Sequence, residues 1–198
     1  MRVILATHNA GKLAEFAALL APIQLELVAL SQFSAVSPAE TGSSFVENAI
    51  LKARHAAQLS GLPAIADDSG LEVDALRGAP GIYSARYAGP QADDAANQDK
   101  LLAQLQAVPD AQRNARFRCA LVYLRWDLDP APLISQASWE GYITRVPRGT
   151  AGFGYDPVFA LADRLQTAAE LSSSEKNRLS HRGQALRGLV AQLASWRK

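Results

Sequence analysis

The chain has 198 residues, which is enough for one domain with a sizeable core. Its hydrophobic fraction of 48% and its charged fraction of 20% are typical of a globular protein in water. The net charge of +1 provides no overall field that would attract nucleic acid or an anionic membrane. Any binding of a polyanion must therefore depend on a local cluster of residues.

The sequence also indicates a cellular location. The single cysteine, Cys119, cannot form an internal disulfide, which agrees with a reducing compartment. Arg2 is followed by only a short apolar run, and no uncharged apolar stretch approaches the length of a membrane span. We therefore expect a cytoplasmic protein whose partners include neither a nucleic acid nor a membrane.

The first third of the chain predicts alternating strands and helices. In chain order, the periodicity predicts a strand at 3–6, a helix at 11–20, a strand at 24–30 and a polar loop at 34–44. The run 45–59, rich in Ala and Leu, is the clearest helix. Gly61 and Pro63 mark its end, because Gly favours the left-handed residue that closes a helix and Pro cannot continue one.

The rest of the chain predicts closely spaced strands between helices. Short strands at 64–66 and 71–76 flank a turn at residues 67–70. The remaining predicted elements are a Gly- and Pro-rich loop at 77–90, a helix at 92–107, a strand at 115–126, antiparallel strands within 133–146, a short helix after the capping box of Ser172 and Glu175, and a helix around 186–193. We therefore expect a single α/β domain over residues 1–198, with a mixed sheet flanked by helices.

A polar turn between the first strand and the first helix is suited to binding phosphate. Its residues are Thr7, His8, Asn9, Ala10, Gly11 and Lys12. Backbone N–H groups at a helix start attract anions, and a Lys adds a full charge. The turn is not a P-loop, because Ala6 replaces the first Gly and Leu13 replaces the Ser or Thr. An ordinary helix N-cap with a solvated Lys is the alternative.

Two adjacent carboxylates, Asp67 and Asp68, follow a predicted strand and could bind Mg²⁺ or activate a water. Neighbouring strand residues point to opposite faces, so we expect one carboxylate to face the site and the other to support it. A common Asp-Ser-Gly turn is the alternative. Lys52 lies on the apolar stripe of the predicted helix 45–59, where it either snorkels or faces an acidic pocket formed with Glu40.

A third polar segment, residues 152–157, combines glycines with the aromatic residues Phe153 and Tyr155. Either ring could stack on a nucleobase, and Asp156 could accept hydrogen bonds from its N–H groups. Further cations follow, which could donate to a base oxygen or a phosphate: Lys176, His181 and Arg182. A β-turn with core aromatics and a solvated basic helix start is the alternative.

These segments together resemble the inosine/xanthosine triphosphate pyrophosphatases, also called Ham1-like or RdgB-like proteins. The resemblance covers nearly the whole chain in the same order. The motifs that carry it are Thr7-His8-Asn9-Ala10-Gly11-Lys12, Phe45-Val46-Glu47-Asn48-Ala49 with Lys52-Ala53, Ala66-Asp67-Asp68-Ser69-Gly70-Leu71, Gly78-Ala79-Pro80-Gly81 with Tyr83-Ser84-Ala85-Arg86, Gly152-Phe153-Gly154-Tyr155-Asp156-Pro157 and Ser180-His181-Arg182.

The resemblance implies a hydrolase that removes non-standard purine nucleotides from the cellular pool. Such an enzyme converts ITP, dITP, XTP and dXTP to the monophosphate and pyrophosphate, and it uses Mg²⁺. The resemblance further implies a homodimer. It also implies a twisted mixed sheet in two lobes with the site in a central cleft.

The resemblance also implies roles for individual residues. Asp68 would be the base that activates water for attack on the α-phosphorus, and Lys52 and Asp67 would support it. The metal ligands would be Asp68 and Glu40, with Glu47 as the alternative to Glu40. The substrate-binding residues would be Thr7, His8, Asn9, Ala10, Gly11, Lys12, Ser69, Phe153, Gly154, Tyr155, Asp156, Lys176, His181 and Arg182.

Base selection should depend on the oxygen at position 6 of the purine. A donor from His181 or Arg182 would pair with that oxygen but would face an amino group in adenine, which leaves a buried donor unpaired. Other interpretations remain open: a pyrophosphatase for other modified nucleotides, a nucleotide-binding protein without catalysis, or an enzyme that cleaves at the γ-phosphate.

Overall fold

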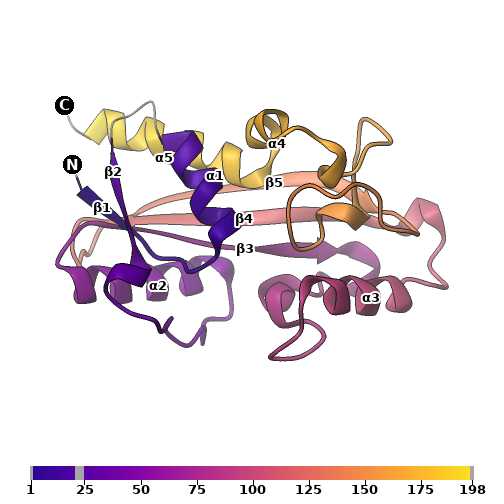
Figure 1. Cartoon of the computed structure of the whole chain (residues 1–198), viewed down its shortest axis with the longest axis horizontal. Helices are drawn as coiled ribbons and strands as arrows, with labels where there is room; N and C mark the ends of the chain where they lie inside the picture. The colour runs from indigo at the N-terminus through magenta and orange to yellow at the C-terminus, as the bar shows by residue number, and fades with distance from the viewer. Residues whose placement is uncertain (1, 21–24, 197–198) are drawn as a thin grey trace. The chain divides into compact units, whose positions relative to one another are not determined.

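A computed structural model describes residues 2–20 and 25–196 of the chain (Figure 1). Its strands are β1 (Arg2–Leu5), β2 (Glu26–Ala29), β3 (Ala64–Val73), β4 (Asn114–Leu124), β5 (Leu133–Ile143) and β6 (Phe159–Leu161). Its α-helices are α1 (Ala10–Leu20), α2 (Phe45–Ser60), α3 (Asp94–Gln104), α4 (Ser173–Leu179) and α5 (His181–Trp196). In this part of the chain no helix is long and apolar enough to cross a membrane.

The strands form one mixed sheet, as predicted, in the order β2-β1-β3-β4-β5-β6. Strand β1 pairs in parallel with both β2 and β3, whereas β5 and β6 are antiparallel. Parallel neighbours need a crossover, which α1 provides between β1 and β2. The expected α/β class with a mixed sheet flanked by helices is therefore confirmed.

The chain divides into two compact units. Unit 1 contains Met1–Asp68, Cys119–Ala137 and Arg182–Lys198, and unit 2 contains Ser69–Arg118 and Ser138–His181. Strands β3, β4 and β5 contribute residues to both units. The boundary in β3 lies directly after Asp68, so the two predicted catalytic carboxylates belong to unit 1.

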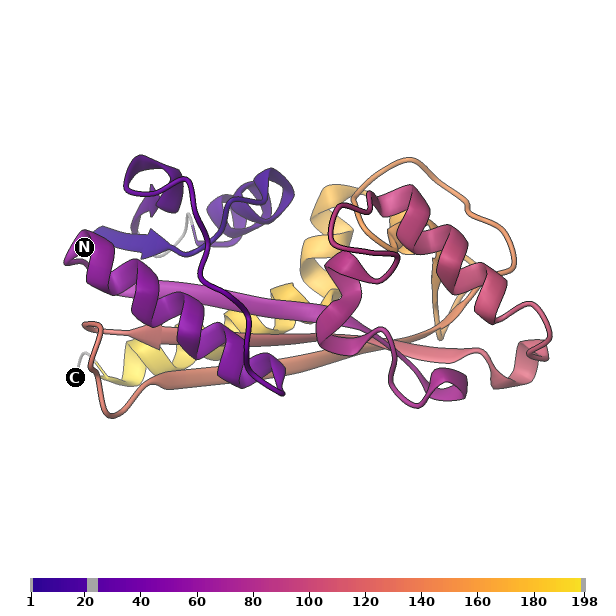
Figure 2. The same cartoon turned by 90° about the horizontal axis from the view of Figure 1, so that it is seen from below.

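In unit 1, helices cover both faces of the sheet (Figure 1 and Figure 2). One buried cluster joins the sheet to α1 and α5 and includes Val3, Leu5, Phe16, Ile65, Leu121 and Leu189. A second cluster joins the opposite face to α2 and includes Ile4, Ala49, Ala53, Ala64, Ala66 and Val122. Alternate residues of β1 and β3 fall in different clusters, as expected for strands buried on both faces.

In unit 2, aromatic side chains form the centre of the core. The ring of Phe117 lies 4.5 Å from that of Phe159 and 6.4 Å from that of Trp139, measured between centroids. Helix α3 contributes Leu101 and Leu105 to the same cluster. Each of these large rings buries much apolar surface.

The predicted turn at residues 67–70 was wrong, because β3 runs without interruption from Ala64 to Val73. Strand β1 pairs with the start of β3, at Ala64 and Ile65, and β4 is the neighbour of β3 on the other side. We attribute the continuous strand to this sheet pairing, which overrides the turn preference of the Asp-Asp-Ser-Gly segment. Its carboxylates remain buried because cationic side chains approach them on both faces. The expectation of several strands within 133–146 was also wrong, since this segment holds the single strand β5.

Other boundaries agree with the predictions to within a few residues. Helix α2 ends at Gly61, which has the left-handed φ of 66°, as the sequence indicated. Ser172 caps α4 by accepting a hydrogen bond from the backbone of Glu175. The loop predicted at 77–90 contains a 3-10 helix at Gly81–Arg86. The predicted start of the second strand, Gln24, lies outside the described residues.

Candidate active site

The two adjacent carboxylates on β3 point to opposite faces of the sheet. Asp68 shares a face with Ala66, which packs toward α2, and Asp67 shares a face with Ile65, which packs toward α1 and α5. Both side chains are buried, with 3% of Asp67 and 6% of Asp68 exposed. Each carboxylate therefore has its own set of charged partners.

Asp68 shares a cation with Glu40. The ammonium of Lys52 lies 2.6 Å from Oδ1 of Asp68 and 3.1 Å from Oε1 of Glu40. Lys52 is buried on α2, so it faces an acidic pocket rather than snorkelling to solvent. Within the described residues, no hydrogen bond occupies Oδ2 of Asp68, which leaves that oxygen able to accept a proton.

Asp67 is held by cations from both ends of the chain. Its Oδ1 lies 2.9 Å from Nζ of Lys12, and its Oδ2 lies 3.4 Å from Nε of Arg182. The guanidinium of Arg182 also pairs with Glu15 on α1. Glu15 was not predicted from the sequence, because its partner lies 167 positions away. This network connects the start of α1, the middle of β3 and the start of α5.

The surroundings drive the pKa values of the two carboxylates in opposite directions. Burial raises the pKa of Asp68, and this effect outweighs the opposing attraction of Lys52. Burial would also raise the pKa of Asp67, but the charges of Lys12, Arg182 and Lys52 together lower it far below its usual value. Paired groups whose pKa values are driven apart commonly have different catalytic roles. Asp68 is therefore suited to accept a proton, and Asp67 is suited to remain a fixed charge.

Lys52 remains a cation despite its burial. Burial alone would lower the pKa of its ammonium, but the carboxylates of Asp68, Asp67 and Glu40 raise it above its ordinary value. The buried ammonium offsets the repulsion between Asp68 and Glu40. Lys52 therefore supports the carboxylate pair and is not itself a base.

The polar turn before α1 includes a side-chain cap. Oδ1 of Asn9 accepts a hydrogen bond of 2.9 Å from the backbone N–H of Lys12, and Oγ1 of Thr7 accepts one from the N–H of Asn9. This arrangement is a helix N-cap. The Lys12 side chain, however, is not simply solvated, because it pairs with Asp67. His8 is exposed, and Ala10 and Gly11 form the first residues of the helix.

The donor set around Lys52 fits Mg²⁺. Within the described residues, no group of three or more His, Cys, Asp or Glu side chains is placed to hold a metal ion. Mg²⁺ commonly takes only one or two protein carboxylates and completes its shell with water and phosphate oxygens. Asp68 and Glu40 already converge on one cation, the ammonium of Lys52. A pair of this kind is sufficient when the substrate is a triphosphate.

Glu47 has different hydrogen-bond partners from Glu40. Its Oε2 accepts hydrogen bonds from the N–H of Ser43 at 2.7 Å and from the hydroxyl of Ser44 at 3.1 Å. Glu47 therefore closes the turn that leads into α2, and its carboxylate oxygen is already engaged. The geometry favours Glu40 over Glu47 as the carboxylate that joins Asp68 in the predicted metal site.

A second group of predicted site residues lies in unit 2. Oδ2 of Asp156 accepts hydrogen bonds from Nζ of Lys176 at 2.7 Å and from the N–H of Phe153 at 2.9 Å. The Lys176 ammonium lies 4.8 Å from the centroid of the Phe153 ring, which is a cation–π distance. Asp156 thus fixes both the turn and the cation above the ring.

The two aromatic residues of this turn are in different environments. Tyr155 is buried in the core of unit 2, where its hydroxyl donates a hydrogen bond of 2.9 Å to the carbonyl of Ser84. Phe153 is only half-buried. Of the two rings that the sequence offered for stacking, Phe153 is the more accessible, and Tyr155 anchors the turn.

Helix α3 also holds this turn, a role that the sequence did not reveal. The carboxylate of Asp94 accepts a hydrogen bond from the N–H of Gly154 at 2.6 Å, and Gln98 donates one to the Gly154 carbonyl at 2.6 Å. Gly154 has a φ of 62°, a conformation that favours glycine. The two residues that hold this turn therefore lie 56 and 60 positions before Gly154 in the chain.

His181 and Arg182 are adjacent in the chain but lie in different units. The imidazole of His181 stacks on Phe117 with ring centroids 4.8 Å apart, and 4% of the residue is exposed. Arg182 belongs instead to the carboxylate network of Asp67. Ser69, the first residue of unit 2, is half-buried on β3 beside Asp68.

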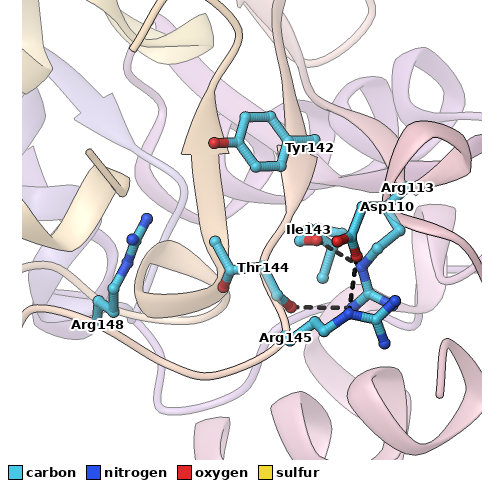
Figure 3. A pocket seen from close by; sticks show the side chains of 7 residues that line it. All are labelled: Asp110, Arg113, Tyr142, Ile143, Thr144, Arg145 and Arg148. Atoms are coloured by element: carbon cyan, nitrogen blue, oxygen red, sulfur yellow. Dashed lines mark hydrogen bonds and ion pairs between the residues drawn. The ribbon is translucent and has the colours of Figure 1, made fainter. Parts of the chain in front are cut away.

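A cavity of about 240 Å³ in unit 2 contains none of the predicted site residues (Figure 3). It is lined by Asp110, Arg113, Tyr142, Ile143, Thr144, Arg145 and Arg148. The guanidinium of Arg113 donates to the backbone carbonyls of Leu105, Ile143 and Thr144. Burial, and then the charge of Arg145, lower its pKa. Because Arg113 joins the end of α3 to the end of β5, we interpret it as a structural clamp.

Similarities to known proteins extend along nearly the whole chain. A sequence model of the Ham1 family matches residues 3–192. The chain is 60% identical to a dITP/XTP pyrophosphatase of Shigella flexneri and 58% identical to one of Escherichia coli strain K12, and each alignment covers 96% of both chains. The solved structure of a HAM1 protein from Coxiella burnetii is 50% identical, with a TM-score of 0.91, and the match covers 98% of this chain and 99% of that one.

A second solved structure is also similar to this chain along nearly its whole length. It is from Mycobacterium abscessus and is described as a nucleoside-triphosphatase / dITP/XTP pyrophosphatase. It is 44% identical to this chain, with a TM-score of 0.77, and the match covers 96% of this chain and 98% of that one.

Proposed function

The chain belongs to the Ham1 family, and on that basis we propose that it is a nucleoside-triphosphate pyrophosphatase. Its substrates are the triphosphates of non-standard purines, namely ITP, dITP, XTP and dXTP, which it hydrolyses to the monophosphate and pyrophosphate. The observation that best supports this assignment is the buried pair Asp67 and Asp68, which point to opposite faces of β3 and pair with different cations, Lys12 and Lys52. The role of the enzyme is to remove these nucleotides from the cellular pool.

Asp68 is the base in the proposed reaction. Its Oδ2 takes a proton from a water, whose oxygen attacks the α-phosphorus. The bond between that phosphorus and the oxygen that bridges it to the β-phosphorus breaks, and pyrophosphate leaves. Lys52 holds Oδ1 of Asp68, so the carboxylate keeps one orientation during proton transfer. The raised pKa of Asp68 makes it a stronger base than an exposed carboxylate.

The triphosphate binds at the start of α1. The N–H groups of Gly11 and its neighbours carry the partial positive charge of a helix N-terminus, and Lys12 adds a full charge. Asp67 holds Lys12 in place through their 2.9 Å ion pair. Asp67 thus positions a phosphate ligand and does not itself exchange a proton.

Mg²⁺ is the proposed cofactor, and Asp68 and Glu40 are its proposed protein ligands. When bound, the ion neutralises phosphate charge and polarises the reacting centre. The residues that would hold it are already drawn together by Lys52. The two-carboxylate set leaves room for phosphate oxygens and water, which is the usual coordination of Mg²⁺ in nucleotide enzymes.

The purine ring is recognised by the aromatic turn and by the basic residues that follow it in the chain. Phe153 offers a ring face for stacking, with Lys176 held above it by Asp156. His181, supported by the stack on Phe117, donates to the oxygen at position 6 of hypoxanthine or xanthine, and Arg182 is the second candidate donor. Adenine would leave that donor unpaired, at a cost of about 1–3 kcal/mol. Guanine shares the oxygen, so its rejection must depend on the 2-amino group.

Product analysis tests this function directly. The intact protein is incubated with ITP, XTP, GTP and ATP, with and without Mg²⁺. We expect monophosphate and pyrophosphate from ITP and XTP, and only with the metal. Release of orthophosphate would indicate cleavage at the γ-phosphate, and equal turnover of ATP would contradict the proposed base selection. Binding without turnover would leave a nucleotide-binding protein as the better interpretation.

The proposed assembly is a homodimer in the cytoplasm. The dimer follows from the family resemblance, and the location follows from the single unpaired cysteine and the nature of the substrates. Sedimentation equilibrium of the purified chain tests the assembly. A mass of one chain across the micromolar range would contradict it.

A further inference from the structure

Asn48 is a buried polar residue that the proposed reaction does not yet use. It lies on α2, four residues before Lys52, and none of its surface is exposed. Its Oδ1 accepts a hydrogen bond of 2.8 Å from the backbone N–H of Gly42. Gly42 follows Glu40 by two residues, so this bond fixes the loop that carries the proposed metal ligand.

The contact between Gly42 and α2 is tight. A Cβ at Gly42 would come within 2.6 Å of Cβ of Glu47 and within 2.7 Å of Oδ1 of Asn48. Real Cβ atoms do not approach other atoms this closely, so only glycine allows the loop to lie against the helix. Asn48 and Gly42 thus form a single lock between the loop and α2.

The other half of the Asn48 side chain has no partner. Within the described residues, its buried Nδ2 has no hydrogen-bond partner. Asn97 on α3 gives a useful comparison, because it is also buried and its Oδ1 also accepts from a loop N–H, that of Ala88. Nδ2 of Asn97, however, donates to the carbonyl of Ala85. A buried amide without an acceptor destabilises the folded protein, which calls for a functional explanation.

The position of this donor points to the phosphate site. Side chains four residues apart lie on the same face of a helix, and each leans toward the helix N-terminus. Lys52, one turn after Asn48, therefore leans back over it and contacts Glu40 and Asp68. Asn48 therefore lies on the same face of α2 as Lys52, the residue that contacts both proposed metal ligands.

We infer that Asn48 is a positioning residue of this site. Its Oδ1 holds the loop that bears Glu40, and its Nδ2 donates to an oxygen that arrives with the magnesium triphosphate. The inference rests on the proposed function, since it needs a triphosphate at this site. It adds a residue that contributes both to the geometry of the metal ligand and to ligand binding.

Three variants of the intact chain separate the two roles of Asn48. Gly42→Ala disturbs the lock but leaves the amide donor, Asn48→Ala removes both, and Asn48→Asp keeps the acceptor for Gly42 but removes the donor. Calorimetry measures two dissociation constants for each variant. One is for Mn²⁺ alone, and the other is for the Mg²⁺ complex of an ITP analogue with an imido group between the α- and β-phosphorus.

We expect Mn²⁺ to bind about tenfold more weakly to Gly42→Ala and to Asn48→Ala, because the Glu40 loop shifts in both. Mn²⁺ should bind to Asn48→Asp at least as tightly as to the wild type. The analogue should bind to Asn48→Ala and to Asn48→Asp roughly tenfold to a hundredfold more weakly than to Gly42→Ala, because a hydrogen bond to a charged oxygen is lost. Asn97→Ala is the control, which should lower the melting temperature without changing the affinity for Mn²⁺.

Each contrary result has a separate meaning. Wild-type affinity of Asn48→Ala for both ligands would overturn the inference. Equal affinity of Gly42→Ala, Asn48→Ala and Asn48→Asp for the analogue would overturn the donor role of Nδ2. Failure of the wild type to bind the analogue would instead count against the proposed function. Melting curves identify any variant that does not fold, and Asn48→Asp then provides the decisive comparison because it keeps the lock.

Discussion

Asp67 and Asp68 are chemically identical neighbours, yet their partners distinguish them at the scale of single residues. Asp67 faces Lys12 and Arg182, and its pKa is held far below the usual range by those charges, which outweigh its burial. Asp68 pairs with Lys52 at close range, and burial raises its pKa. The alternation of side chains along β3 is the cause of this difference. The same substitution should therefore have different effects at the two positions.

The substitution Asp68→Asn should reduce kcat by about a hundredfold to ten-thousandfold, which is the usual contribution of a general base. KM should change much less, because the proton transfer occurs in the transition state and not in substrate binding. Asp67→Asn should instead raise KM and lower the melting temperature, since Lys12 and Arg182 lose their buried counter-charge. Steady-state kinetics on dITP and thermal melts of both variants measure these effects. Near-normal turnover of Asp68→Asn would remove it as the base.

The substitution His181→Phe should lower the preference for ITP over ATP. Phenylalanine keeps the stack on Phe117 but has no donor for the oxygen at position 6. We expect the ratio of the two kcat/KM values to fall by about tenfold to a hundredfold, the equivalent of one or two lost hydrogen bonds. An unchanged melting temperature would show that packing is preserved. If the ratio also remained unchanged, selection of the base would depend on another residue.

Residue types revealed much of this site before the structure was known. A Lys on the apolar stripe of the predicted helix indicated either snorkelling or an acidic pocket, and Lys52 does lie between Asp68 and Glu40. The supporting residues Glu15, Asp94 and Gln98 were not predicted. Their partners lie between 56 and 167 positions away, and no local pattern encodes such pairs.

At the scale of elements, the strongest local signals predicted helices better than strands. Helix α2 has an Ala- and Leu-rich sequence and a Gly at its end, and its bounds agree with the prediction to one residue. Strand β3 was predicted as two strands around a turn, because Asp, Ser and Gly favour turns. The pairing of β3 with neighbours that are distant in sequence decides its conformation. That information is absent from a local window.

The connection between β4 and β5 depends on one carboxylate, Asp129. The oxygens of this buried side chain accept hydrogen bonds from the backbone N–H groups of Arg125 and Ala131, each at 3.0 Å, and from the Arg125 guanidinium. Asp129→Ala should destabilise the protein by about 1–3 kcal/mol, because these donors lose their acceptor. Denaturant melts of the two proteins measure this difference. Asp163→Ala, which removes an exposed partner of Arg164, is the matched control and should have little effect.

The contribution of Asp129 should also depend on pH. The hydrogen bonds from Arg125 lower the pKa of Asp129 below its value in the unfolded chain. A depressed pKa stabilises the folded state above the unfolded pKa, which is about 4, and this stabilisation is lost as the pH falls. The stability difference between the wild type and Asp129→Ala should be constant from about pH 8 to pH 5 and should shrink below about pH 4. If the stability difference between the two proteins instead increased at low pH, that result would contradict the ion pair between Asp129 and Arg125.

At the scale of the whole molecule, composition predicted a globular protein but could not predict the order of the strands in its sheet. The net charge of +1 agrees with a candidate site in which each cation is paired with a carboxylate. The order β2-β1-β3-β4-β5-β6 depends on pairing between distant segments. The family resemblance implied a twisted mixed sheet but not this order of strands.

Removal of the metal should affect activity far more than it affects the stability of the whole molecule. In this structure the ammonium of Lys52 already separates Asp68 from Glu40, so the metal-free protein does not contain two unshielded carboxylates. EDTA should therefore abolish hydrolysis of dITP yet lower the melting temperature by less than about 2 °C, because a weakly held ion contributes little binding free energy. Activity should return when Mg²⁺ is added. A large fall in the melting temperature would instead mean that the metal stabilises the fold. It would also mean that Lys52 does not compensate for the two carboxylates when the metal is absent.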